Sequence, residues 1–108
     1  MRMTTKTLRD VQQEIDVLIK EEWQSNYWTP LSSLARLTEE VGELAREINH
    51  RYAEKPKKAS EGEGSIAAEM GDILFILASL ANSTGVDLDT AYEEVMKKYQ
   101  SRDAQRWK

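Results

Sequence analysis

The feature that most constrains the fold is an apolar run at residues 73–81, in which Ser79 is the only polar side chain. The run lies in a segment that begins at Ser65, a good helix N-cap, and stops before Gly85, a common helix terminator. A helix that is apolar on nearly every side is buried on nearly every side. A chain of 108 residues can bury such a helix most easily in a bundle that includes a partner subunit. We therefore expect a helical protein that forms oligomers.

Three further helices are predicted by apolar residues that recur at steps of three and four. Their expected starts are Thr4 or Thr5 for the first, Thr29 followed by Pro30 for the second, and Asp87 or Asp89 for the fourth. The first helix should end near Glu22, and the charged segment 53–65, which contains proline and two glycines, should be a loop. The sequence thus predicts a single all-α domain over residues 1–108, a four-helix bundle completed by oligomerisation.

Two acidic pairs lie on the second and third of these helices. Glu40 and Glu43 are three residues apart, as are Glu69 and Asp72, so each pair places both carboxylates on one helix face. Glu69 and Asp72 directly precede the apolar run, where crowded and poorly hydrated carboxylates repel one another. A divalent cation relieves this repulsion, and oxygen ligands suit Mg²⁺ or Mn²⁺. The four residues predict a metal site.

The composition argues against several other classes of protein. The absence of cysteine excludes a disulfide framework and a zinc–thiolate site, and the net charge of −4 gives no nucleic-acid-binding signature. From the polar N-terminal residues we expect no signal peptide, and from the length of the apolar run we expect no membrane-spanning helix. We therefore expect a cytoplasmic protein without nucleic-acid or membrane partners.

Two other groups of side chains could serve a ligand. Trp23 and Trp28 belong to an aromatic segment that could either cover the core or stack on a nucleobase. Lys98 and Arg102 are four residues apart near the end of the last helix. Cations there favour the helix dipole, and these two could also grip phosphates together.

The acidic residues also allow two readings other than a magnesium site. An acidic helix face can simply be solvated. Glu47 and His50 form a Glu-x-x-His pattern of the kind found in di-iron carboxylate bundles. That class uses two such motifs, and this chain has a single histidine.

The acidic pattern resembles that of the MazG-type all-α nucleoside triphosphate pyrophosphohydrolases, in particular the small single-domain members. That family carries Glu-Glu-x-x-Glu, a spacer and Glu-x-x-Asp. The residues that match these two motifs are Glu39, Glu40 and Glu43, followed by Glu69 and Asp72. The resemblance extends from about residue 23 to residue 102. It departs at Met96, where the family often has asparagine.

The resemblance implies Mg²⁺-dependent hydrolysis of a (deoxy)nucleoside triphosphate between its α- and β-phosphates, with monophosphate and pyrophosphate as products. It also implies a homodimer or a homotetramer. The residues assigned by the resemblance are Glu40, Glu43, Glu69 and Asp72 as metal ligands, and Trp23 or Trp28, together with His50, as base contacts. Glu40 or Glu43 should act as the general base, and Lys98 and Arg102 should neutralise the leaving pyrophosphate.

The physiological role that we expect is the removal of non-canonical nucleotides, with control of the nucleotide pool as the alternative. The sister phosphoribosyl-ATP pyrophosphohydrolases usually have a histidine shortly after the aspartate, and residues 73–77 contain none. That substrate is therefore disfavoured. The alternative from a different class is a non-catalytic helical interaction or regulatory module, in which the carboxylates are only surface residues.

Overall fold

The computed structural model describes residues 5–52 and 65–101, and within these ranges helices are joined by short loops, without strands. The elements are α1 (Leu8–Val17), the π-helical turn η1 (Leu18–Glu22), α2 (Pro30–Arg51), α3 (Ile66–Thr84) and α4 (Leu88–Ser101). The predicted all-α class with four helices is confirmed. Of the predicted loop at residues 53–65, all but Ser65 lies outside the described residues.

The predicted starts of α2 and α3 are confirmed by their capping geometry. The Thr29 side chain accepts a hydrogen bond from the backbone N–H of Ser32, with Pro30 at the first helical position. Ser65 caps α3, which ends at Gly85 in the left-handed conformation (φ 75°), the conformation that favours glycine.

The predicted start of the first helix near Thr4 or Thr5 was wrong by a few residues, because Thr7 is the N-cap of α1. Thr7 and Asp10 form a capping box, in which each side chain accepts a hydrogen bond from the backbone N–H of the other residue. For α4, Asp87 is the residue that caps, since its carboxylate accepts from the backbone N–H of Thr90.

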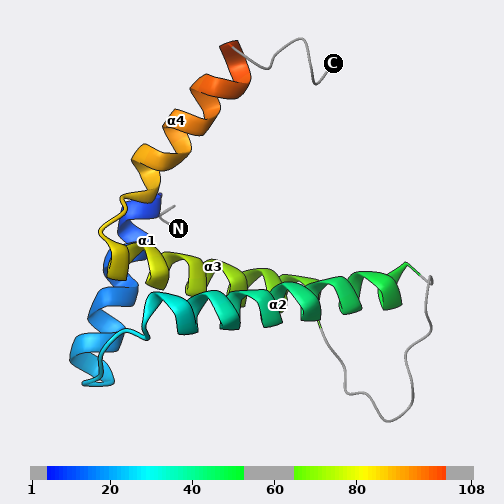
Figure 1. The fold of residues 1–108 in the computed structure, drawn as a ribbon, viewed down its shortest axis with the longest axis horizontal. Helices are drawn as coiled ribbons and strands as arrows, with labels where there is room; N and C mark the ends of the chain where they lie inside the picture. Colours follow the sequence, from blue (N-terminus) through cyan, green and yellow to red (C-terminus); the bar gives the residue numbers. More distant parts are fainter. Residues whose placement is uncertain (1–4, 53–64, 102–108) are drawn as a thin grey trace.

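Helices α2 and α3 lie side by side and antiparallel, α1 crosses one end of this pair, and α4 extends away from it (Figure 1). The buried core is small: within the described residues it centres on Ile15, Ile19 and Ala78. The main packing partner of α4 is α1, and no residue of α4 is buried. A single chain therefore leaves the fourth helix largely uncovered.

Within one chain, helix α3 is not buried on every side, and its predicted burial against a partner subunit stays a prediction. Ala78 is fully buried, but Leu74 and Leu77 are 42% and 40% exposed. By length and composition alone this helix could cross a membrane. It also carries Glu69 and Asp72 and packs lengthwise along α2, as the central helix of a bundle does (Figure 1).

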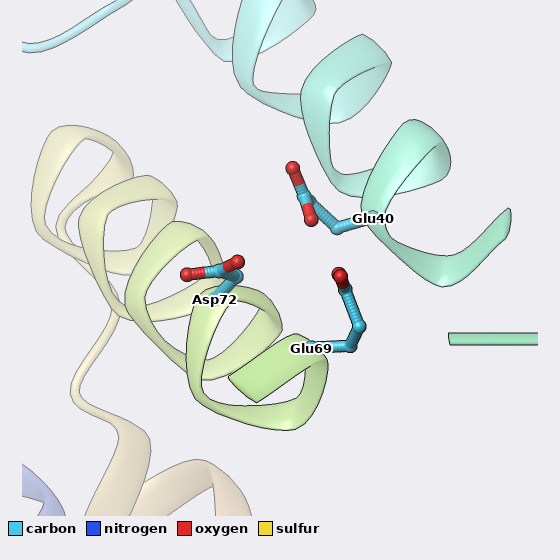
Figure 2. A group of neighbouring side chains, drawn as sticks. All are labelled: Glu40, Glu69 and Asp72. Carbon is cyan, nitrogen blue, oxygen red and sulfur yellow. The ribbon is translucent and has the colours of Figure 1, made fainter. Parts of the chain in front are cut away.

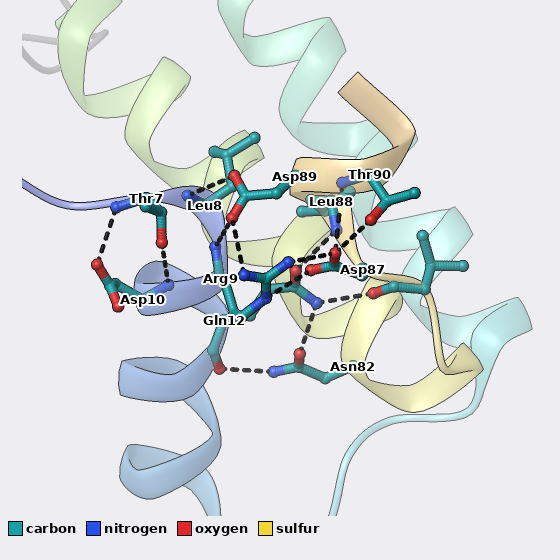
Figure 3. A network of polar contacts seen from close by, with 11 residues as sticks. Thr7, Leu8, Arg9, Asp10, Gln12, Asn82, Asp87, Leu88, Asp89 and Thr90 are labelled. Atoms are coloured by element: carbon teal, nitrogen blue, oxygen red, sulfur yellow. Dashed lines mark hydrogen bonds and ion pairs between the residues drawn. The ribbon is translucent and has the colours of Figure 1, made fainter. Parts of the chain in front are cut away.

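A polar network joins α1 to the turn between α3 and α4 (Figure 3). The buried Gln12 side chain donates to Asn82 Oδ1 (2.9 Å) and to the Val86 carbonyl (2.8 Å), and it accepts from the backbone N–H of Leu88 (2.9 Å). Asn82 in turn donates to the Gln12 carbonyl (2.9 Å). The network fixes the end of the molecule at which α1 meets the α2–α3 pair.

Candidate active site

Three of the four predicted metal ligands converge between α2 and α3. One carboxylate oxygen each from Glu40, Glu69 and Asp72 can be chosen so that all three lie within 4.8 Å of one another. Figure 2 shows Glu40 facing Glu69 and Asp72 across the space between the helices. Spacing by three residues places Glu69 and Asp72 on one face of α3, and the antiparallel pairing of α2 and α3 brings Glu40 opposite them.

The surroundings of Glu69 disfavour its charged form. The pKa of Glu69 is raised, first by its hydrogen-bonding contact with the Glu40 carboxyl, then by burial and by the negative charges of Glu40, Asp72 and Glu43. Its Oε2 atom is buried and makes no hydrogen bond within the part of the chain described. A buried acceptor without a donor, beside two further carboxylates, fits a site for a divalent cation.

Glu43 lies at the border of this carboxylate cluster. Its charge is near enough to raise the pKa of Glu69, but its oxygens are outside the group formed by Glu40, Glu69 and Asp72. The side chain of Glu43 is exposed. It is thus beside the predicted metal site without belonging to its tightest part.

A cavity of about 350 Å³ opens directly beside the carboxylates. Its lining combines aromatic, polar and charged side chains, among them Trp23, Trp28, Arg36, Glu40, Asp72 and Phe75. The rings of Trp23 and Phe75 are 6.2 Å apart between centroids and inclined at 48°. Both predicted aromatic residues therefore lie in the same cavity as two of the predicted metal ligands.

Tyr27 anchors the aromatic segment to the scaffold. Its hydroxyl donates to Asp16 and accepts from the amide of Asn82 (3.0 Å). Burial and the bond to Asp16 raise the pKa of Tyr27 to about 12. The segment that carries Trp23 and Trp28 is thereby tied to both α1 and α3.

His50 does not join this site within one chain. It lines a separate cavity near the C-terminal end of α2, with Glu47, Tyr52 and Met70. Ten residues separate Glu40 from His50, which is about 15 Å along a helix. The structure therefore does not bring His50 and Trp28 together around a base.

Of the two predicted phosphate-binding residues near the end of the last helix, only Lys98 lies within the described residues, and it does not line the cavity. Lys98 lies on α4 with its ammonium 5.4 Å from the centre of the Tyr99 ring, and it is not among the residues that line the cavity. Arg102 is outside the described residues.

The residue that sequence reasoning missed is Arg36. Its Nε lies 3.6 Å from Glu40 Oε1, and its guanidinium is 5.5 Å from the centre of the Trp28 ring. The i,i+4 spacing of Arg36 and Glu40 was a visible signal in the sequence.

The chain is similar in sequence to known proteins. Residues 28–107 match the MazG nucleotide pyrophosphohydrolase domain. The chain is 51% identical to the protein YpjD of Bacillus subtilis over 105 residues, which are 97% of this chain and 94% of YpjD. It is 34% identical to YvdC of the same organism in an alignment of 98 positions that covers 82% of this chain and 89% of YvdC.

Solved structures are similar in fold as well. A crystal structure of YPJD from Bacillus subtilis matches with a TM-score of 0.78 and 50% identity, over 92% of this chain and 100% of that one. The Bacillus-conserved MazG protein, described as a nucleotide pyrophosphohydrolase, matches with a TM-score of 0.75 and 46% identity, over 94% and 97% of the two chains. The chain belongs to the MazG nucleotide pyrophosphohydrolase family.

Proposed function

We propose that the protein hydrolyses (deoxy)nucleoside triphosphates to nucleoside monophosphate and pyrophosphate in a reaction that depends on Mg²⁺ or Mn²⁺. The observation that carries this proposal is the convergence of Glu40, Glu69 and Asp72 beside an aromatic cavity. The membership of the MazG family supports a pyrophosphohydrolase activity. The cavity supplies room for a base, and the carboxylates supply ligands for the cation that a triphosphate carries.

Different residues of the chain would have different roles in the reaction. Glu40, Glu69 and Asp72 would hold the cation, which when bound polarises a phosphoryl group and lowers the pKa of a water molecule. Glu43 is exposed and borders the cluster, so it is the better placed of the two predicted bases to accept a proton from the attacking water. Trp23 and Trp28 would stack on the base and keep the nucleotide in position.

The deciding experiment is product analysis with a panel of canonical and modified nucleoside triphosphates in the presence of Mg²⁺. We expect pyrophosphate and the nucleoside monophosphate in equal amounts, and we expect a chelator to stop the reaction. Release of orthophosphate with a nucleoside diphosphate would contradict the proposed bond, and inactivity towards the whole panel would contradict the enzyme. A preference for modified bases would support a role in removing non-canonical nucleotides.

A non-catalytic interaction module is the alternative, and the exposed apolar side chains of the single chain are what favour it. A thermal-shift titration separates the two. Because a ligand that binds only the folded state raises its stability by mass action, the enzyme should melt at a higher temperature with Mg²⁺ and nucleotide. The module should not respond.

We also propose that the protein is a homodimer or a homotetramer. The apolar stripe of α2 repeats every seven residues at Leu34, Val41 and Ile48, and these side chains are 53%, 49% and 40% exposed. Leu74 and Leu77 of α3 are exposed to a similar degree. A second copy is the partner that would complete the helical bundle and cover both stripes.

A further inference from the structure

We propose that Arg36 binds the phosphate chain of the substrate, and that it turns from Glu40 to the phosphate when Glu40 serves as a metal ligand. This inference rests on the proposed function, since it concerns the same cavity. It identifies the Arg36 side chain as a positively charged partner for the substrate phosphates. The acidic cluster alone contains no such group.

The first argument is position. Among the described residues that line the cavity, Arg36 is the only one with a positively charged side chain. It contacts both Glu40 and Trp28, and Asp72 lines the same cavity. A bound nucleotide would place its base against the tryptophans and its phosphates at the carboxylates. Part of the nucleotide then lies next to the Arg36 guanidinium. Lys98 is not in that lining.

The second argument is that the present partners of Arg36 leave most of its donors unused. The distance of 3.6 Å to Glu40 is that of an ion pair rather than a good hydrogen bond. The contact with Trp28 is a cation–π contact with the guanidinium carbon 5.5 Å from the ring centre, and it supplies no oxygen or nitrogen acceptor for the five N–H donors. Within the described residues, no hydrogen bond is donated by this side chain. The half-exposed Arg36 side chain can therefore donate hydrogen bonds to the phosphate oxygens of a nucleotide that enters the cavity.

The third argument is electrostatic. Glu40 is mostly covered, with 16% of its side chain exposed, whereas 53% of the Arg36 side chain is exposed. Without metal, the guanidinium offsets part of the charge of Glu40. When the carboxylate of Glu40 is neutralised by a cation, its attraction for Arg36 falls. The phosphate oxygens are then the stronger acceptors, and the planar guanidinium can bind two of them at once.

The test compares Arg36→Gln with Arg46→Gln, a variant at an exposed arginine of the same helix outside the cavity. Affinity is measured by calorimetry for a triphosphate with a non-hydrolysable α,β-imido bridge, and for the corresponding nucleoside. Arg36→Gln should bind the analogue roughly ten- to a hundredfold more weakly, while its affinity for the nucleoside changes little. Arg36→Lys should recover part of the loss, because it keeps the charge but not the planar group.

A second readout does not need the nucleotide. Because Arg36 competes with a cation for Glu40, its removal should tighten the binding of Mn²⁺ alone by about two- to tenfold, as measured by electron paramagnetic resonance. A purely structural role for Arg36 would leave Mn²⁺ affinity unchanged or weaken it.

The inference is overturned if Arg36→Gln binds the analogue as well as Arg46→Gln does, while the wild-type protein remains active. A wild-type protein that neither binds nor hydrolyses any triphosphate would instead refute the proposed function and the role of Arg36 with it. The activity of the wild-type protein thus distinguishes a failure of the Arg36 proposal from a failure of the proposed function.

Discussion

The carboxyl group of Glu69 faces Glu40 and Asp72 in surroundings that disfavour a negative charge. Its pKa is raised, with the contact to Glu40 as the largest cause. A group whose pKa is higher in the folded than in the unfolded state stabilises the fold below its ordinary pKa. That contribution is lost as the pH rises through the raised value. At neutral pH the metal-free cluster therefore works against folding.

Glu69→Gln should remove this repulsion and keep the shape of the side chain. In the presence of a chelator at neutral pH we expect the variant to melt ~2–5 °C above the wild type, with the difference vanishing as the pH is lowered below the ordinary range of a glutamate. The same variant should lose most of the stabilisation that Mg²⁺ gives to the wild type. Differential scanning calorimetry across pH, with and without metal, measures both effects. A variant less stable than the wild type in chelator would show that the cluster is not repulsive.

At this scale the sequence could indicate which side chains share a helix face, but not which side chains of other elements they meet. The spacing of Glu69 and Asp72 was sufficient to place them on one face of α3. The approach of Glu40 to them depends on how α2 is rotated against α3, and no local pattern records that rotation. For the same reason Arg36, which meets Trp28 and Glu40 on one side of α2, was overlooked.

At the scale of the elements, a buried amide lies at the centre of the junction of α1 with the turn before α4. Gln12 is 8% exposed and satisfies groups from Asn82, Val86 and Leu88 (Figure 3). On the same junction, Asp89 accepts from the backbone N–H groups of Leu8 and Arg9 (both 3.1 Å). Hydrogen bonds thus join the N-terminal ends of α1 and α4.

Gln12→Ala should lower the free energy of unfolding by about 2–3 kcal/mol, because it leaves buried polar groups without partners. The neighbouring exposed residue provides the control, and Gln13→Ala should change stability by no more than about 0.5 kcal/mol. Urea denaturation at neutral pH measures both. Equal effects of the two substitutions would contradict the assignment of the junction to Gln12.

The element boundaries were predictable wherever capping chemistry is local. Thr29 and Pro30 open α2, and Ser65 and Gly85 bracket α3, as expected from their residue types. The start of α1 was misplaced because its capping box uses Asp10 in place of the usual glutamate or glutamine. The π-helical turn η1 has no distinct sequence signal, and it was read as a continuation of the same helix.

At the scale of the whole molecule, the most informative feature is the amount of apolar surface that one chain leaves uncovered. On α4, Tyr92, Val95 and Tyr99 share one face and are 57%, 42% and 44% exposed. The sequence predicted these stripes, and it predicted a partner subunit to bury them. The sequence could not indicate which apolar stripes pack against each other in the oligomer, because hydrophobic periodicity describes one helix at a time.

Val95→Glu should therefore shift the protein towards monomers, since a charge placed in an apolar interface costs several kcal/mol. The control is Lys97→Glu, which also adds negative charge to α4 but on the opposite side of the helix. Light scattering coupled to gel filtration should find the control oligomeric and Val95→Glu shifted towards the monomer mass. A wild-type chain that is already monomeric at micromolar concentration would contradict the proposed oligomer.

The central claim is that Glu40, Glu69 and Asp72 form the metal site of a pyrophosphohydrolase. The most direct measurement is the rate of Mg²⁺-dependent pyrophosphate release by Asp72→Asn, set beside Glu39→Gln, which alters an exposed glutamate adjacent to the site. The account predicts a loss of roughly a hundredfold or more for Asp72→Asn and a nearly unchanged rate for Glu39→Gln. An Asp72→Asn protein as active as the Glu39→Gln control would contradict it.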